Sequence, residues 1–429
     1  MKVLVTGATG LIGSAICARL HAEGHEVTAA IRPGSSPVPA SVQHTLSVDM
    51  AKATQKSDWT PHLEGIEAVV NCVGVMQDSP RDDTEGVHVG GASALFLACE
   101  ELGVRRVIQI SAIGVDRGPV SAFSETKSRG DAALMERDLD WVILRPSVVL
   151  GRPVFGASAL FRGLAALPVL PVVKGTGELQ VVQLDDVTAT VAFFLKSSAP
   201  ARVACELVGP QRLTMSEVVA RYRQWMGWRP ARRFELPRLL SALLYRAGDL
   251  AGALGWRSPM RSTAAKEIAR GAVGDATHWS ALTGIVPQSL DAALATKPVT
   301  VQDRWFAKLY FLKPLIFVVL ALFWIATGIV SLTTGFHSGV DLMVQARTGM
   351  LAVPGVVAGA IADILVGLAI AYRPAARRGL HAAIALSLFY ILAGTILLPE
   401  LWNEPLGPLM KIWPILALHF VALAILDER

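Results

Sequence analysis

The chain has 429 residues, of which 52% are hydrophobic and 17% charged, and its net charge is +5 at pH 7. This length allows roughly two or three domains with buried cores. The positive charges are spread along the chain instead of gathering in one segment, which argues against nucleic acid as a partner. The four cysteines form no CxxC pair and have no histidine at a metal-ligand spacing. We therefore expect free, buried thiols in a reducing compartment and no metal site.

The first residues have the pattern of a strand, a tight turn and a helix. Residues 2–6 are a short run rich in valine, as expected for a parallel strand that is buried on both faces. The turn that follows places Gly7, Gly10 and Gly13 at intervals of three, and helical spacing of apolar residues begins at Ser14. Such glycines permit a tight turn that brings the backbone close to a pyrophosphate, which the amides of the helix N-terminus then bind.

Further strands are expected at residues 26–31, around 46–48, at 68–72 and at 107–110. Their regular alternation with helical segments predicts an α/β fold, a doubly wound parallel sheet of the Rossmann type with its ligand at the carboxyl ends of the strands. Residues 152–295 mix prolines and glycines with short apolar runs. We expect them to form a small substrate domain. We place the end of the soluble part, which comprises residues 1–297, just after this domain.

Residues 6–13, TGATGLIG, resemble the cofactor motif of the atypical and extended short-chain dehydrogenase/reductases. The resemblance covers about residues 1–295 and is closest to the branch that includes the nucleotide-binding accessory subunit of respiratory complex I. It implies that a dinucleotide contacts the turn residues Thr6, Gly7, Thr9, Gly10, Leu11, Ile12 and Gly13.

The same resemblance implies cofactor contacts from residues that follow later strands, namely Asp49, Asn71, Val73, Gly74 and Pro146. The residues themselves leave an alternative open, since a carboxylate such as Asp49 after a strand also caps the next helix. Asp185 and Asp186 lie in another segment similar to a family signature, and an N-cap pair is the alternative there.

The residues after the second strand bear on which dinucleotide is bound. NAD-selective sites place Asp or Glu there to bind the ribose hydroxyls, whereas this chain has Arg32, followed by Ser35 and Ser36. A cation at this place suits the 2′-phosphate of NADP(H), so we expect NADP(H) to be preferred over NAD(H). The alternative is a solvated loop arginine.

The catalytic tyrosine of the family is absent from the position where the resemblance places it. The family uses a tyrosine whose pKa is lowered by a lysine four residues later, and the matching residues are Phe123 and Lys127. The resemblance implies that Lys127 holds the nicotinamide ribose and that Ser111 stands near the third catalytic position, unless the register places Ala112 there. Because a phenyl ring has no ionisable proton, ordinary carbonyl reduction is not expected at position 123.

Four apolar runs, at residues 314–332, 350–372, 380–398 and about 406–426, are long enough to cross a bilayer. Residues 305–429 resemble the four-helix DoxX-like domain, some relatives of which are associated with quinone redox chemistry. With the front half in the cytoplasm, the arginines at 373, 377 and 378 agree with the positive-inside rule. We therefore predict an all-α, multi-pass domain of the inner membrane, with both termini cytoplasmic.

Asp363 is the one acidic residue inside the predicted spans. Gly355, Gly359, Asp363 and Gly367 repeat every four residues and share one helix face, where another helix can approach closely. Asp363 is either a functional group or part of a structural hydrogen bond between helices, and His419 in the last span lies at a similar depth. The roles of both residues stay open.

Residues 237–255 carry leucines at helical spacing, which fits either a helix on the membrane surface or one that faces the protein core. For the whole chain two functions are compatible with these patterns. One is a membrane-anchored NAD(P)(H)-dependent oxidoreductase that acts on an apolar or quinone-like substrate. The other is a catalytically silent NADP(H)-binding scaffold, or an assembly or sensor protein of a membrane complex, and Phe123 favours this second function.

Overall fold

The computed structural model describes residues 1–429 except 35–37, 81, 119, 406 and 428–429. The chain divides into two compact units. Unit 1 comprises residues 1–252 and 258–307, and unit 2 comprises residues 253–257 and 308–429.

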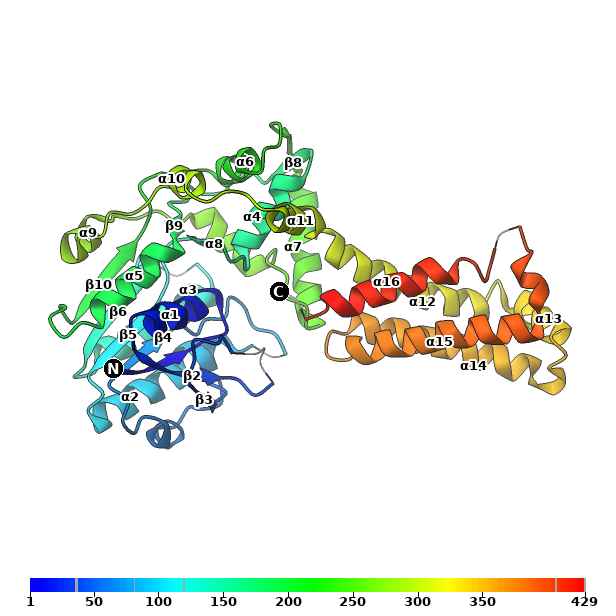
Figure 1. Cartoon of the computed structure of the whole chain (residues 1–429), viewed down its shortest axis with the longest axis horizontal. Coiled ribbons are helices and arrows are strands. Elements are labelled where there is room, and N and C mark those ends of the chain that lie inside the picture. The colour runs from blue at the N-terminus through cyan, green and yellow to red at the C-terminus, as the bar shows by residue number, and fades with distance from the viewer. Residues whose placement is uncertain (35–37, 81, 119, 406, 428–429) are drawn as a thin grey trace. The chain divides into compact units, whose positions relative to one another are not determined.

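A parallel seven-stranded sheet forms the centre of unit 1, in the order β10-β6-β5-β4-β1-β2-β3 (Figure 1). This confirms the doubly wound Rossmann sheet predicted from the alternation of strands and helices. The strands are β1 (Lys2–Thr6), β2 (Glu26–Ile31), β3 (His44–Ser47), β4 (Ala68–Asn71), β5 (Arg106–Ile110), β6 (Asp140–Pro146) and β10 (Val203–Leu207).

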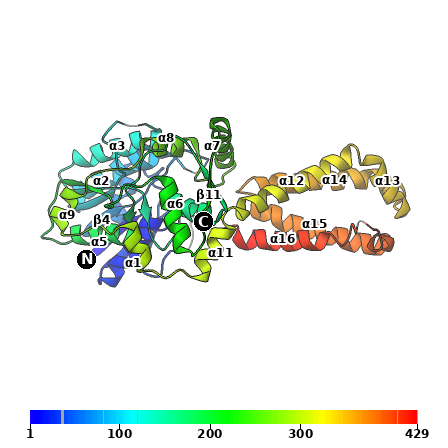
Figure 2. The same cartoon turned by 90° about the horizontal axis from the view of Figure 1, so that it is seen from above.

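Helices cover both faces of the sheet, as Figure 2 shows from a second side. The core on one face is built with α1 (Leu11–Ala22) and α5 (Leu184–Phe194), and the core on the other face with α2 (Gly91–Leu102) and α3 (Ala122–Met135). The valines of β1 and β4 are fully buried between the two cores, which explains why these strands are continuous apolar runs. The first helix begins at Leu11, three residues earlier than the apolar spacing indicated.

The rest of unit 1 consists of short parallel strand pairs and helices. β7 (Val149–Leu150) pairs with β9 (Val182–Gln183), and β8 (Val169–Val172) pairs with β11 (Arg232–Glu235). The helices are α4 (Ala157–Ala166), α6 (Met215–Trp225), α7 (Arg238–Ala253), α8 (Ser262–Arg270), α9 (Thr277–Thr283), α10 (Leu290–Ala295) and α11 (Val301–Leu309), the last of which ends in unit 2.

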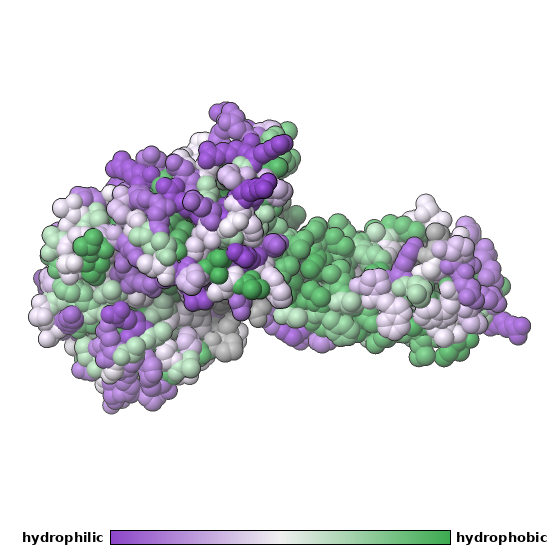
Figure 3. Space-filling model, turned by 45° about the horizontal axis from the view of Figure 1, so that its top comes forward, coloured by the Kyte–Doolittle hydropathy of each residue, from purple (hydrophilic) through white to green (hydrophobic). Residues whose placement is uncertain are grey.

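Unit 2 is helical, with α12 (Leu312–Leu332), α13 (Phe336–Gln345), α14 (Ala352–Ala371), α15 (Ala376–Leu397) and α16 (Ile412–Ile425). Among the described residues, three helical stretches are long and apolar enough to cross a membrane: Val301–Leu332, Gly349–Ala371 and Ala376–Leu397. The fourth expected span is shorter, because α16 has only 14 residues, and part of that span lies outside the described residues. Figure 3 shows hydrophobic residues gathered over the helices of this unit.

Small residues set the packing inside unit 2. A Cβ added at Gly328 of α12 would lie 2.4 Å from the carbonyl oxygen of Ala360, and one added at Gly367 of α14 would lie 2.7 Å from that of Ala321. Asp363 Oδ1 accepts a hydrogen bond of 2.9 Å from the hydroxyl of Tyr390 on α15. This is the structural hydrogen bond that the sequence left open as one alternative for Asp363. His419 Nε2 accepts a 2.9 Å hydrogen bond from the indole of Trp324.

Candidate functional site at the carboxyl edge of the sheet

The glycine-rich turn after β1 is shaped by close contacts between main-chain atoms. Gly7 has a φ of +65°, and a Cβ there would lie 2.9 Å from the backbone of Cys72. A Cβ at Gly13 would lie 2.3 Å from the carbonyl oxygen of Gly7. Gly10 precedes α1 and brings no side chain to cap it, and none of the described residues in the first turn is acidic. The turn and helix N-terminus therefore fit a pyrophosphate, which the amides would bind.

A ladder of buried side chains joins the carboxyl ends of β1, β4 and β5. Thr6 Oγ1 lies 2.5 Å from Asn71 Oδ1, and Asn71 Nδ2 donates to Gln109 Oε1 at 2.7 Å. The same Asn71 oxygen accepts from the backbone N–H of Val73 at 3.3 Å. Asn71 therefore fixes the start of the loop that continues through Val73 and Gly74. Gln109 was not predicted, although its polar side chain in an otherwise apolar strand is a signal for a buried partner.

Lys127 reaches this same loop from α3. Its Nζ donates to the carbonyl oxygens of Val73, at 3.1 Å, and Ile110, at 2.9 Å. A Cβ added at Gly74 would lie 3.5 Å from this Nζ. The residue is only 4% exposed, and burial lowers the pKa of Lys127 to about 8. The structure thus brings together three of the predicted site residues, Lys127, Val73 and Gly74, and Lys127 is not a surface lysine.

Ser111 has a carboxylate as its partner. Its hydroxyl donates to Asp131 Oδ2 at 2.8 Å, and Arg145 Nε lies 3.2 Å from the same oxygen. Burial raises the pKa of Asp131, while the Ser111 hydrogen bond and the Arg145 charge act in the opposite direction. Asp131 was not predicted. Its place four residues after Lys127, on the same helix face, is the signal that was available.

His88 packs against the ring of Phe123 and was also missed. The two rings meet edge to face, with centroids 5.8 Å apart. His88 Nε2 accepts from the backbone N–H of Val75 at 3.1 Å, and Nδ1 lies 2.8 Å from the hydroxyl of Thr126. Burial, assisted by the Lys127 charge, lowers the pKa of His88 to about 2. His88 is therefore neutral at physiological pH and holds the loop after Gly74 in place.

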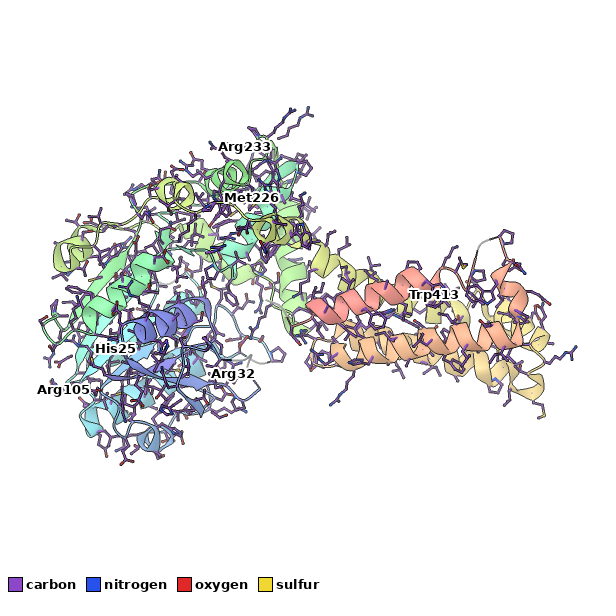
Figure 4. All side chains as sticks on the ribbon, viewed as in Figure 1. His25, Arg32, Arg105, Met226, Arg233 and Trp413 are labelled. Carbon is purple, nitrogen blue, oxygen red and sulfur yellow. The ribbon has the colours of Figure 1, made fainter. Side chains whose placement is uncertain are left out.

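Arg32 lies where β2 ends (Figure 4) and faces two carboxylates. Its Nη1 is 3.1 Å from Asp82 Oδ1, and its Nε is 3.7 Å from Asp49 Oδ1. Arg32 and Asp49 are thus brought together, and Asp82, which comes from 50 residues further along the chain, was not predicted. Ser35 and Ser36 lie outside the described residues.

Pro146, Asp185 and Asp186 lie on other elements, a strand and a helix. Pro146 ends β6, and its carbonyl oxygen accepts from the N–H of Ile113 at 3.1 Å. Asp185 and Asp186 are in the first turn of α5, where Gln183 is the N-cap residue. Asp185 pairs with Lys297 at 2.7 Å, and Asp186 accepts from the N–H of Gln288 at 2.9 Å. The two aspartates therefore tie α5 to the segment before α11 and do not cap the helix.

Two families match the chain in separate segments. Residues 7–160 match an NAD(P)H-binding family, and residues 321–420 match the DoxX-like family. The first segment contains the glycine turn, Lys127 and the loop after β4. The second contains α14, α15 and most of α12 and α16.

Curated relatives are similar to this chain at low identity. An uncharacterized protein of Mycobacterium tuberculosis is 27% identical over 220 residues, which are 51% of this chain but only 23% of that protein. The ceramide reductase of Caulobacter vibrioides is 25% identical over 55% of this chain and 73% of its own length. Sterol demethylase protein B of Methylococcus capsulatus is 25% identical over 71% of this chain and 99% of its own length.

Solved structures share the fold of unit 1. The enzyme WbmG of Bordetella bronchiseptica, in complex with NAD, covers 69% of this chain and 92% of its own, with 15% identity and a TM-score of 0.53. The UDP-glucuronic acid 4-epimerase of Bacillus cereus, in complex with UDP-glucuronic acid and NAD, covers 73% and 100%, with 18% identity and a TM-score of 0.51. The chain therefore joins an NAD(P)-binding Rossmann domain, with a fold like that of the short-chain dehydrogenase/reductases, to a C-terminal DoxX-like membrane domain.

Proposed function

We propose that this protein is a membrane-anchored, NADP(H)-dependent oxidoreductase that acts on an apolar or quinone-like substrate. The observation that carries the proposal is Lys127, a buried ammonium beside Gly74 at the carboxyl edge of the sheet. Two of its three donors contact main-chain carbonyls, which leaves one donor for an oxygen of the ribose or the substrate. A nicotinamide dinucleotide supplies a hydride when bound.

The apolar substrate class is supported by the membrane domain and by the relatives. One relative is named for reduction of a ceramide, and another, from Streptomyces griseus, for reduction of an alkanoyl furanone phosphate. Both names describe molecules with alkyl chains and polar oxygen groups. A protein with spanning helices is suited to substrates of this kind because it shares the bilayer with them.

The proton that balances the hydride is assigned to Lys127. Phe123 has no proton to give, and both nitrogens of His88 are engaged with Val75 and Thr126. Burial lowers the pKa of Lys127 to about 8, which is close to neutral pH and therefore suits a group that gives and takes protons. The second candidate function is an NADP(H)-binding scaffold or sensor, which Phe123 favours because position 123 holds no acid or base.

Dinucleotide binding can be tested at Gly10. We expect Gly10→Glu to weaken NADPH binding about 100-fold, because a carboxylate would repel phosphates at the N-terminus of α1. Gly10→Ala is the matched control, since its Cβ would lie 3.2 Å from the Gly7 carbonyl oxygen, a contact that a small shift relieves. The measurement is NADPH affinity by fluorescence titration. Unchanged affinity in a folded Gly10→Glu protein would place the site elsewhere.

The preference for NADP(H) depends on Arg32. We expect Arg32→Gln to lower the ratio of NADPH to NADH affinity by about 10- to 100-fold, the value of one charge-assisted hydrogen bond. Asp82→Asn is the control that acts in the opposite direction, because it removes a carboxylate partner from Arg32 and should raise the ratio. Equal ratios in the wild type and Arg32→Gln would exclude Arg32 as the 2′-phosphate partner.

The chemical step can be tested at position 123. We expect Phe123→Tyr to raise the rate of carbonyl reduction with NADPH by roughly 100- to 10,000-fold, because the phenol would lie one helical turn from the Lys127 charge. The gain should disappear when Lys127→Met is added. Rates on a panel of ketones and quinones provide the measurement. The scaffold function predicts no gain, and a wild type that already equals the tyrosine variant would show that position 123 does not limit the reaction.

We further propose that the protein lies in the inner membrane, with unit 1 and the arginines at 373, 377 and 378 on the cytoplasmic side. Alkaline phosphatase, which is active only outside the cytoplasm, should then be active when fused after Asn403 and inactive when fused after Arg378. Fusion activities in intact cells, normalised to protein level, provide the measurement. The reverse pattern would invert the orientation.

A further inference from the structure

α7 has its apolar face directed away from the protein. The residues that it buries are small or polar: Ser241, Gly248 and Gly252. Leu239, Leu243 and Leu250, on the opposite side of the helix, are 74%, 52% and 63% exposed. A helix that belongs only to a soluble domain buries its leucines and exposes its polar residues. The alternative of a core-facing helix is therefore wrong, and an apolar face of this size requires a partner.

Two glycines fix this orientation. A Cβ at Gly248 would lie 1.7 Å from the carbonyl oxygen of Met260, and one at Gly252 would lie 2.7 Å from the guanidinium of Arg261. Asp249 Oδ1 also accepts from the N–H of Ser262 at 3.1 Å. Because a larger side chain does not fit against residues 258–261, α7 cannot turn its leucines inward. The leucine face is thus directed outward by the packing of the opposite face.

The residues that follow this face in the chain belong to the helical unit. Residues 253–257 belong to unit 2. There the carbonyl of Leu254 accepts from the N–H of Arg373 at 3.0 Å, and the indole of Trp256 donates to the carbonyl of Ala371, the last residue of α14, at 2.7 Å. Leu250 precedes Leu254 by four residues, so the chain cannot separate their Cα atoms by more than roughly 14 Å. The leucine face is therefore tied by a short piece of chain to a residue of unit 2.

Basic residues accompany the apolar face. The exposed arginines among residues 229–260 are Arg229, Arg232, Arg233, Arg238, Arg246 and Arg257, against only two acidic residues, Glu235 and Asp249. A helix with a leucine face and arginines along its edges is typical of the interfacial layer, where the arginines attract anionic headgroups. The charge therefore favours a lipid surface over a second copy of this basic segment.

We propose that the leucine face of α7 is inserted in the interfacial layer of the bilayer that unit 2 spans. α7 is also connected to the dinucleotide site, because Asp249 Oδ1 accepts from Gln77 Nε2 at 3.0 Å and Gln77 follows Gly74 by three residues. A lipophilic substrate would thus reach the loop after β4 along α7. This last step, unlike the membrane contact itself, rests on the proposed function.

The membrane contact can be tested with a nitroxide spin label on the full-length protein. Leu243→Cys carries the label in a Cys72→Ala background, since the other three thiols are buried. Ser197→Cys, exposed in the turn that follows α5, is the control. In vesicles of phosphatidylcholine and phosphatidylglycerol, we expect collisions of the 243 label with oxygen to exceed collisions with a water-soluble nickel chelate severalfold. The control label should show the reverse.

Each other outcome overturns the proposal. Preferential collision with the nickel chelate would place the face in water, and protection from both reagents would mean that protein covers it, such as a second copy. NADPH affinity of the labelled protein verifies folding. Because the label needs no substrate, its result is independent of whether the proposed reaction occurs. The route is tested separately: Leu239→Gln/Leu243→Gln/Leu250→Gln should slow turnover of a bilayer-dissolved substrate and spare its short-chain, water-soluble analogue.

Discussion

The approach of α1 to the turn after β1 is the constraint on which the site depends. Gly13 packs directly against the carbonyl of Gly7. Gly7 has a left-handed conformation and packs directly against the backbone of Cys72. One set of main-chain contacts therefore places the helix N-terminus, the end of β1 and the loop after β4 at fixed distances. Since these contacts are backbone to backbone, no rotamer change can relieve a side chain added at Gly13. The position of Lys127 follows, because its ammonium binds the carbonyl of Val73 in that loop.

Around Lys127 buried charged and polar groups contact one another, and the phenyl ring at position 123 adds no acid or base to them. A buried ammonium is costly unless it is paired and hydrogen-bonded, and here two carbonyls bind it directly. Asp131 adds a negative charge on the same helix face, while Ser111 and Arg145 hold that carboxylate. Phe123 contributes packing against the ring of His88. The site is thus built around a lysine of altered acidity.

The sequence predicted the local features well because they depend on short-range pattern. Strands β1 and β2 have the predicted bounds, and β4 and β5 differ by one residue, since runs of valine and isoleucine and glycine punctuation are local signals. The partners of the site residues were not predictable in this way. Asp82 meets Arg32 across 50 residues, and His88 meets Thr126 across 38, so only the fold brings them together. The outward direction of the α7 leucines could not be predicted either. Their spacing in the sequence identifies an apolar helix face but does not show what covers that face.

The close packing of α12 and α14 limits which molecules can lie between these two helices. At Gly328 and Gly367 each helix backbone comes so near the other that even a methyl group would collide with a carbonyl oxygen. At these two positions the helices leave no room between them for an alkyl chain or a water molecule. The two helices therefore form one closely packed pair.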